Sequence, residues 1–255
     1  GKQWGVSYDV GGVTDWFEVF GADAQGTYNF GTDGGFSGTG RAEQAIQYRV
    51  KFSDLKVAVQ YLASDEQLGA VDENGSPFNR LLNFSDSMGI SVVYKAPMEI
   101  GLGVAYNKTT LDIGLTEQLF EKVDDELISA HITYRQHNNL GIHIALVYTD
   151  MSNHDYNDIG KVMKKARGLE LFSQYRFEND ISVIFGYISL EDNSDSGYLG
   201  ADGTYHKKYS ILSAKYHWDD DFYIFIESKI DDSKLSEQST SLDENATGVG
   251  LMFTF

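Results

Sequence analysis

Residues 55–63 read LKVAVQYLA, and the alternation of apolar and polar side chains in this stretch decides the fold. One face of the extended chain carries Leu55, Val57, Val59 and Tyr61, and the other carries Lys56, Ala58 and Gln60. Successive side chains of a β-strand point to opposite faces, so this period of two predicts a strand between an apolar and a polar environment. A single segment is a weak signal, because any half-buried strand shows the same pattern.

The same period of two recurs along the whole chain. About eleven segments show it, each roughly as long as the 9–11 residues that a tilted strand needs to cross a bilayer. They lie near residues 41–52, 55–63, 90–95, 100–107, 128–135, 142–149, 169–177, 181–187, 212–218, 224–229 and 249–255. This repetition predicts an all-β protein: a transmembrane, antiparallel, up-and-down β-barrel that forms a single domain over residues 1–255.

Two classes of connection alternate between these segments. Short polar turns follow every second segment, at residues 53–54, 97–99, 137–139, 178–180 and 219–221. Long polar loops fill the other positions, at about 8–40, 64–86, 111–121, 153–165, 193–205 and 233–245. Short turns on one rim and long loops on the other are typical of an outer-membrane barrel, whereas a soluble barrel has no reason to alternate so regularly.

Tyrosines mark both ends of the predicted strands. Those on the apolar face are Tyr48, Tyr61, Tyr94, Tyr106, Tyr134, Tyr148, Tyr175, Tyr187 and Tyr216. Two outward-facing rings of tyrosine, one at each rim, are typical of a barrel in lipid, where they lie at the two membrane interfaces. The alternative interpretation is that tyrosine favours strand ends over a soluble core.

The face opposite the tyrosines is polar. We predict that it lines a pore with Lys56, Gln60, Arg135, His143, Glu170, Arg176, Lys215 and Glu227. So many charged groups cannot all be buried in a dry core without a large desolvation cost, but they can line water. The pattern therefore favours a water-filled channel over a packed interior.

The formal net charge of the chain is -18, and it contains no cysteine. A nucleic-acid partner is not expected, because a protein that binds a duplex needs a basic face. The lack of cysteine excludes thiol catalysis and cysteine metal sites. Much of the negative charge falls at residues 64–86, 111–125 and 231–245. An acidic vestibule there would concentrate cations, so we expect a cation preference.

No residue pattern indicates an enzyme, a cofactor or a metal site. The six histidines lack metal-ligand spacing, and no motif marks a serine and a histidine as a nucleophile and its base. His131 and His143 would point inward from adjacent strands, where pore lining is the simpler explanation. An outer-membrane barrel hydrolase and a soluble or structural β-barrel are the less favoured alternatives.

The chain resembles the general trimeric porins of Gram-negative bacteria. The residues that carry the resemblance are 1–10 (GKQWGVSYDV), 14–15, 20–21, 40–41, 48–49, 55–62 and Phe255. In that family the opening run closes the fifth of sixteen strands. The resemblance therefore implies about twelve strands here, either as a fragment of a longer chain or as a smaller barrel. It also implies a homotrimer in outer-membrane lipid.

The resemblance implies a constriction as well. Residues 8–40 would fold into the pore as the constriction loop, with Asp15 and Glu18 on the loop and Arg41 and Arg49 on the facing wall. Opposite charges across a narrow gap would create a transverse field that aligns polar solutes.

Three positions weaken that assignment. Val19 stands where the family has a second acidic residue, and Ala22 replaces a glycine. Arg41 could instead be an ordinary charge at a strand start that pairs with Glu43. The expected function is an outer-membrane porin for passive diffusion of ions and small hydrophilic solutes, with a sugar-specific porin as the alternative.

Overall fold

The computed structural model describes residues 3–21, 23–26, 38–42, 45–63, 66–71, 77–116, 119–136, 140–158, 162–194, 204–219, 221–235 and 245–253. Within these ranges the chain is almost entirely β-structure. Its strands are β1 (Gln3–Trp4), β2 (Arg41–Ala42), β3 (Ala45–Phe52), β4 (Leu55–Leu62), β5 (Glu66–Val71), β6 (Pro77–Ala96), β7 (Ile100–Thr116), β8 (Leu119–Arg135), β9 (Gly141–Ser152), β10 (Ala166–Arg176), β11 (Ile181–Asp192), β12 (His206–His217), β13 (Phe222–Asp231) and β14 (Ala246–Phe253).

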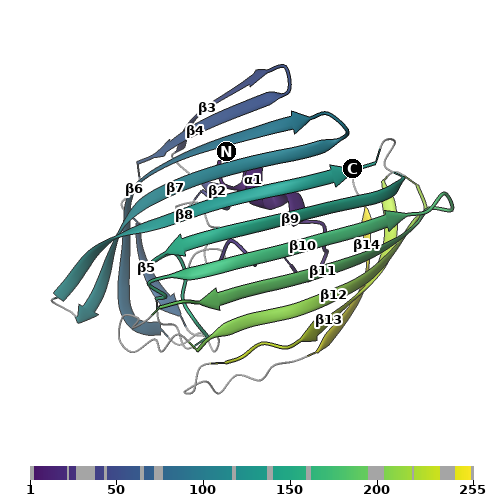
Figure 1. Ribbon diagram of the computed structural model, residues 1–255. Helices are drawn as coiled ribbons and strands as arrows, with labels where there is room; N and C mark the ends of the chain where they lie inside the picture. Colours follow the sequence, from purple (N-terminus) through teal and green to yellow (C-terminus); the bar gives the residue numbers. More distant parts are fainter. Residues whose placement is uncertain are drawn as a thin grey trace.

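Twelve strands form one antiparallel sheet in the order β14-β13-β12-β11-β10-β9-β8-β7-β6-β4-β3, with β5 paired to β6 beside this path. Almost every strand therefore pairs with the next one along the chain, and the sheet curves strongly (Figure 1). The predicted all-β fold, an antiparallel up-and-down β-barrel with about twelve strands in this chain, is confirmed in its strand number and strand order. Among the strands described, β3 and β14 do not pair with each other, so the sheet is an open, curved wall.

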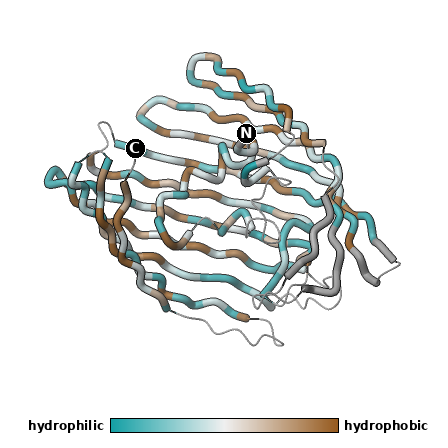
Figure 2. The backbone as a smooth tube through the Cα atoms, turned by 180° about the vertical axis from the view of Figure 1, so that it is seen from behind, coloured by the Kyte–Doolittle hydropathy of each residue, from teal (hydrophilic) through white to brown (hydrophobic). Residues whose placement is uncertain are grey.

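Cross-strand register places apolar side chains in rows on the convex face. Val59 lies opposite Ile90, Ile90 opposite Tyr106, and Tyr106 opposite Ile128. Val59, Ile90 and Ile128 are exposed, Ile128 with 54% of its surface, and Tyr106 is half-buried. Figure 2 shows the alternation of hydrophobic and hydrophilic residues along the strands. A slip of one residue would move a whole apolar row to the other face, so the alternation fixes the register.

The short turns fall where the sequence predicts them. Ser53, Met98, Glu99 and Asp180 adopt positive φ angles of 52°, 63°, 59° and 64°, which let the chain reverse within a few residues. Of the other two predicted turns, residues 137–139 and residue 220 lie outside the described part of the chain.

Two of the predicted long loops are largely strand. Residues 64–86 contain β5 and the first half of β6, and residues 111–121 contain the ends of β7 and β8. Polar stretches such as Ser85-Asp86-Ser87 hide the pattern, because a strand that extends beyond a membrane needs no apolar face. The described parts of the other predicted loops have little strand. Residues 27–37, 195–203, 236–244 and Phe255 lie outside the described residues.

The start of the chain lies on the concave side of the wall. We call residues 3–21 and 23–26 the infolded segment. It contains the helix α1 (Tyr8–Gly11) and a 3-10 turn (Gly12–Thr14), visible inside the curve in Figure 1. Phe17 packs into a buried cluster with Phe172, Ile184 and Ile211 of the wall. The core thus lies between the infolded segment and the sheet. No described helix is long and apolar enough to cross a membrane.

A glycine lets the infolded segment approach the wall closely. A Cβ atom added to Gly168 on β10 would lie 1.8 Å from the carbonyl oxygen of Ala24. Any other residue would push the two backbones apart. Gly168 therefore sets how deeply residues 23–26 can lie against the sheet.

Candidate functional site

One carboxylate of the wall holds the middle of the infolded segment. Glu227 on β13 is fully buried, and it accepts hydrogen bonds from the backbone N–H groups of Glu18, Val19 and Phe20 at 3.2, 3.0 and 2.8 Å. A carboxylate can be buried when donors of this kind replace its water. Glu227 therefore fixes residues 18–20 against β13.

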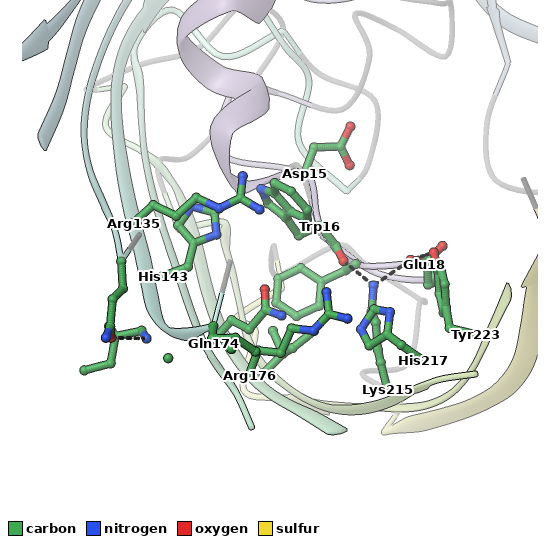
Figure 3. Close-up of a pocket in the computed structure, with 16 residues that line it drawn as sticks. Asp15, Trp16, Glu18, Arg135, His143, Gln174, Arg176, Lys215, His217 and Tyr223 are labelled. Carbon is green, nitrogen blue, oxygen red and sulfur yellow. Dashed lines mark hydrogen bonds and ion pairs between the residues drawn. The ribbon is translucent and has the colours of Figure 1, made fainter. Parts of the chain in front are cut away.

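The side chain of Glu18 faces the same wall. Its carboxylate accepts hydrogen bonds from Nζ of Lys215 at 2.6 Å and from the hydroxyl of Tyr223 at 2.5 Å. Lys215 also donates to the carbonyl oxygen of Trp16 at 2.8 Å. Figure 3 shows this network, with Lys215 between Trp16 and Glu18. The Lys215 side chain is only 7% exposed. The positive charge of Lys215 and the negative charge of Glu18 therefore cancel each other next to the sheet.

A second ion pair fixes the beginning of the infolded segment. Asp9 of α1 lies 2.5 Å from a guanidinium nitrogen of Arg49 on β3, and it accepts a hydrogen bond from the hydroxyl of Ser91 at 3.0 Å. Arg49 also donates to the carbonyl oxygen of Trp4 at 2.9 Å. The guanidinium of Arg41 lies over the Trp4 ring, 5.2 Å from its centroid. The helix α1 is thus tied to the strands that follow it.

A buried histidine fixes the end of the infolded segment. Nδ1 of His154 lies 2.6 Å from a carboxylate oxygen of Asp125, and Nε2 lies 3.0 Å from the carbonyl oxygen of Gln25. Burial by itself lowers the pKa of His154, but Asp125, Asp155 and the Gln25 carbonyl outweigh it and raise this pKa above its ordinary value. With an acceptor at each ring nitrogen, the site favours the protonated imidazole.

A cavity of about 340 Å³ lies between the infolded segment and the short-turn ends of the wall strands. The infolded segment contributes Trp16, and β8, β9 and β10 contribute Arg135, His143 and Arg176 (Figure 3). The guanidinium of Arg135 lies 5.3 Å from the centre of the Trp16 ring, and the His143 ring meets that ring edge-on at 5.3 Å. The cavity therefore offers cationic donors next to a flat aromatic surface.

The four predicted constriction residues have different partners. Asp15 is exposed and accepts a hydrogen bond from the hydroxyl of Tyr8 at 2.8 Å. Glu18 pairs with Lys215, Arg49 pairs with Asp9, and Arg41 stacks on Trp4. The structure therefore brings Arg49 to an acidic residue of the infolded segment, but that residue is Asp9. Glu43, the alternative partner of Arg41, lies outside the described residues, so the assignment of the four to a constriction stays a prediction.

The eight predicted lining residues all face the concave side. Arg135, His143, Arg176 and Lys215 line the cavity of Figure 3, and Lys56 lines a second cavity beside Asp9 and Arg49. Gln60, Glu170 and Glu227 are buried and line neither of these cavities, and His143 and Lys215 are buried as well. The burial of Gln60, Glu170 and Glu227 differs from the expectation that they line water. The infolded segment supplies the reason for two of them, since Glu170 and Glu227 accept backbone hydrogen bonds from Ala24 and residues 18–20.

Several residues that position the infolded segment were not predicted from the sequence. Asp9, Trp16 and His154 belong to polar stretches without a periodic pattern, so no sequence signal marks them. Asp125 does have a signal. It continues the inward series of Leu127, Ser129 and His131 by one more step toward the long-loop end of β8, and it is 1% exposed.

A family model described as "Gram-negative porin" matches residues 1–255. Outer membrane protein S2 of Salmonella typhi is 25% identical over 283 residues, an alignment that covers 100% of this chain and 71% of the relative. Outer membrane porin C of Enterobacter cloacae is 24% identical over 263 residues, which cover 100% of this chain and 69% of the relative.

Solved structures share the fold at low sequence identity. OmpF of Salmonella typhi, in complex with daunomycin, matches with a TM-score of 0.69 and 18% identity over 99% of this chain and 72% of its own. The trimer form of OmpT from Vibrio cholerae matches with a TM-score of 0.64 and 13% identity, covering 99% and 75%. An anion-selective porin from Comamonas acidovorans matches with a TM-score of 0.52 and 13% identity, covering 88% and 64%.

Proposed function

Because this chain belongs to the Gram-negative porin family and is an outer-membrane porin, we propose that it forms a water-filled channel for passive diffusion, with a preference for cations. Ions and small hydrophilic solutes would cross it without any bond being made or broken. Selectivity would come from the width of the pore and the charges that line it.

One observation carries this proposal: the infolded segment is held against the concave face at three separate places. The anchors are Glu227, the pair of Asp9 with Arg49, and His154 with Asp125. A segment fixed in this way narrows a channel to a constant width, and the cavity beside it leaves room for solvent. A fixed constriction acts as a size filter, whereas a mobile one would not.

The cation preference is proposed from charge. The net charge of -18 sets up a negative potential that attracts cations toward the channel mouth. Asp15 is an exposed carboxylate on the infolded segment, while Lys215 is neutralised by Glu18. Arg41 on the facing side would complete a transverse field with Asp15, to which Arg49 would add less because Asp9 pairs with it.

The surroundings of the channel follow from the same family. The exposed apolar convex face would contact outer-membrane lipid. We also propose a homotrimer, since OmpT of Vibrio cholerae has been solved in a trimer form. A trimeric mass in mild detergent is expected, and a monomeric mass would contradict this part of the proposal.

Reversal potentials in planar bilayers test the proposal. Under a potassium chloride gradient we expect a cation-selective potential, which Asp15→Ala lowers and Arg41→Ala raises. A unit charge beside the ion path changes the permeability ratio by a factor of about two to five at low salt. Asp150→Ala is the matched control, because Asp150 pairs with Arg167 on the convex face.

Each outcome has a separate meaning. A zero or anion-selective potential at low salt would refute the cation preference. Selectivity that is unchanged in both variants would remove Asp15 and Arg41 from the constriction. An absence of conductance together with turnover of ester substrates would favour a barrel hydrolase, and conductance that saturates with one sugar would favour a sugar-specific porin.

A further inference from the structure

We propose that the cavity beside Trp16 binds small organic carboxylates that carry a flat apolar group, and so gives the channel a subsite for such solutes. This inference rests on the proposed channel function, because a solute must pass the cavity to use it. The proposed ligands are anions, whereas the channel as a whole is proposed to prefer cations. Three features of the cavity support the inference: an excess of positive charge, buried polar atoms without a partner among the described residues, and an apolar part of the wall.

The cavity has an excess of positive charge. Among the described residues, no carboxylate pairs with the guanidinium of Arg135, and Arg176 has only Asp180 at 3.6 Å, a pair that is partly exposed. Lys215 adds no net charge, because Glu18 lies 2.6 Å from it. Asp15 also lines the cavity and accepts a hydrogen bond from the hydroxyl of Tyr8, so three cationic side chains (Arg135, Arg176 and Lys215) face two carboxylates (Asp15 and Glu18) and the cavity keeps a net positive charge. Guanidinium groups bind carboxylates in a bidentate geometry with fixed orientation.

Two buried polar atoms at the cavity lack a partner within the described structure. They are Nδ1 of His143 and Nε of Arg176. His143 is 9% exposed, and its ring packs against two aromatic groups: Trp16 edge-on at 5.3 Å and Phe172 at 5.0 Å. A buried donor or acceptor without a partner costs free energy, which a ligand atom or water can recover. These atoms lie on adjacent strands, since the register pairs β9 with β10 along their whole length.

One part of the cavity wall is apolar and flat. The Trp16 ring stacks near Phe172, with ring centroids 6.0 Å apart, and Leu140 and Ile142 also line the space. An inorganic anion such as phosphate would lose hydrating water next to this apolar surface, and the surface has no hydrogen-bond donor to replace that water. A carboxylate attached to a ring would instead place its charge on the arginines and its ring beside Trp16. The volume of about 340 Å³ accommodates a molecule of that size.

The experiment uses the protein purified from its own outer membrane, with two readouts. The first is the blockage of single-channel current by benzoate, compared with benzamide, which has the same ring without the charge, and with inorganic phosphate. The second is quenching of tryptophan fluorescence in detergent, which reports binding whether or not the protein conducts. We expect saturable block and quenching by benzoate and little effect of benzamide or phosphate at the same concentration.

Variants connect the effect to the cavity. Arg135→Gln and Arg176→Gln should each weaken benzoate binding about tenfold, the usual effect of one lost hydrogen-bonded charge. Arg135→Lys and Arg176→Lys should weaken it less, because the charge stays while the bidentate geometry is lost. The matched control is Arg167→Gln, on the same strand as Arg176 but on the convex face with Asp150, and it should bind benzoate like the unaltered protein. Trp16→Phe should remove the quenching.

Several results would overturn the inference. Equal effects of benzoate and benzamide would show that charge plays no part, and equal effects of phosphate would assign the cavity to anions in general. Benzoate binding that is unchanged in both arginine variants would place the site elsewhere. Conductance without benzoate binding would refute the subsite and leave the channel proposal intact. Binding without conductance would refute the channel proposal alone.

Discussion

Glu227 anchors the infolded segment to β13. Its position on the inward face follows from the period of two, which predicts that it lines water. In the structure it is fully buried, because the backbone of residues 18–20 supplies the donors that water would otherwise supply. The charge is therefore used for anchoring and is not available to a solute.

Glu227→Gln should loosen the infolded segment. The amide keeps one acceptor oxygen but loses the charge, and hydrogen bonds to charged groups are worth about 1.5–3 kcal/mol. We expect the free energy of unfolding to fall by about that amount and single-channel current to become larger or noisier. Glu191→Gln, on an exposed site of β11, is the control. Unchanged stability and current in Glu227→Gln would show that the anchor lies elsewhere.

The His154 anchor should make stability depend on pH. Its folded-state pKa is raised above the ordinary 6.5, chiefly by Asp125 against the opposing effect of burial, with Asp155 and the Gln25 carbonyl also facing the ring. A raised pKa means that this stabilisation is complete below about pH 6.5 and is lost as the pH rises through the folded-state value. Unfolding measured across that range should show the loss, and His154→Gln should flatten it. A profile that is the same in both proteins would rule out His154 as the source.

At the scale of elements, sequence periodicity predicts the strands well and the loops less well. Apolar and polar side chains alternate along a strand when its two faces lie in different environments. The alternation is therefore strong where one face is apolar and the other polar, as in β4 and β9. It disappears where a strand leaves the apolar zone, and for that reason the pattern wrongly predicts loops at the long ends of β6, β7 and β8. The anchors of the infolded segment could not be predicted either, since each joins residues that are distant in sequence and share no pattern.

The infolded segment lies so close to β10 that a larger residue at Gly168 should destabilise the protein. Gly168→Ala would place a methyl group on the Ala24 carbonyl, where a separation of 1.8 Å between the added carbon and the carbonyl oxygen leaves no room. Overpacking of this kind costs about 1–3 kcal/mol and should displace residues 23–26. We expect lower stability and altered single-channel conductance. Ala214→Val, on the convex face of β12, adds volume where there is space and should change neither. Normal behaviour of Gly168→Ala would mean that the segment can shift without cost.

At the scale of the whole molecule, the net charge of the chain and the arginines of the Trp16 cavity act on solutes over different distances. The net charge of -18 acts through solvent over roughly a Debye length, about 10 Å at 0.1 M salt. The arginines of the Trp16 cavity act only on a solute in contact with them. A channel can therefore draw cations to its mouth and still hold an organic anion for a short time at its wall.

The hydrogen bond between the Glu18 backbone and Glu227 spans 209 residues of sequence, and this separation dictates the order of assembly. Contacts between such distant residues form late, because the entropy of closing a long chain must be lost before the contact repays it. The wall up to β13 must exist before residues 18–20 have anything to bind. During refolding, strand signals should therefore appear before the fluorescence of Trp16 reaches its final value, and simultaneous change of both would refute this order. A nascent channel would in that case be wider, and leakier, than the finished one.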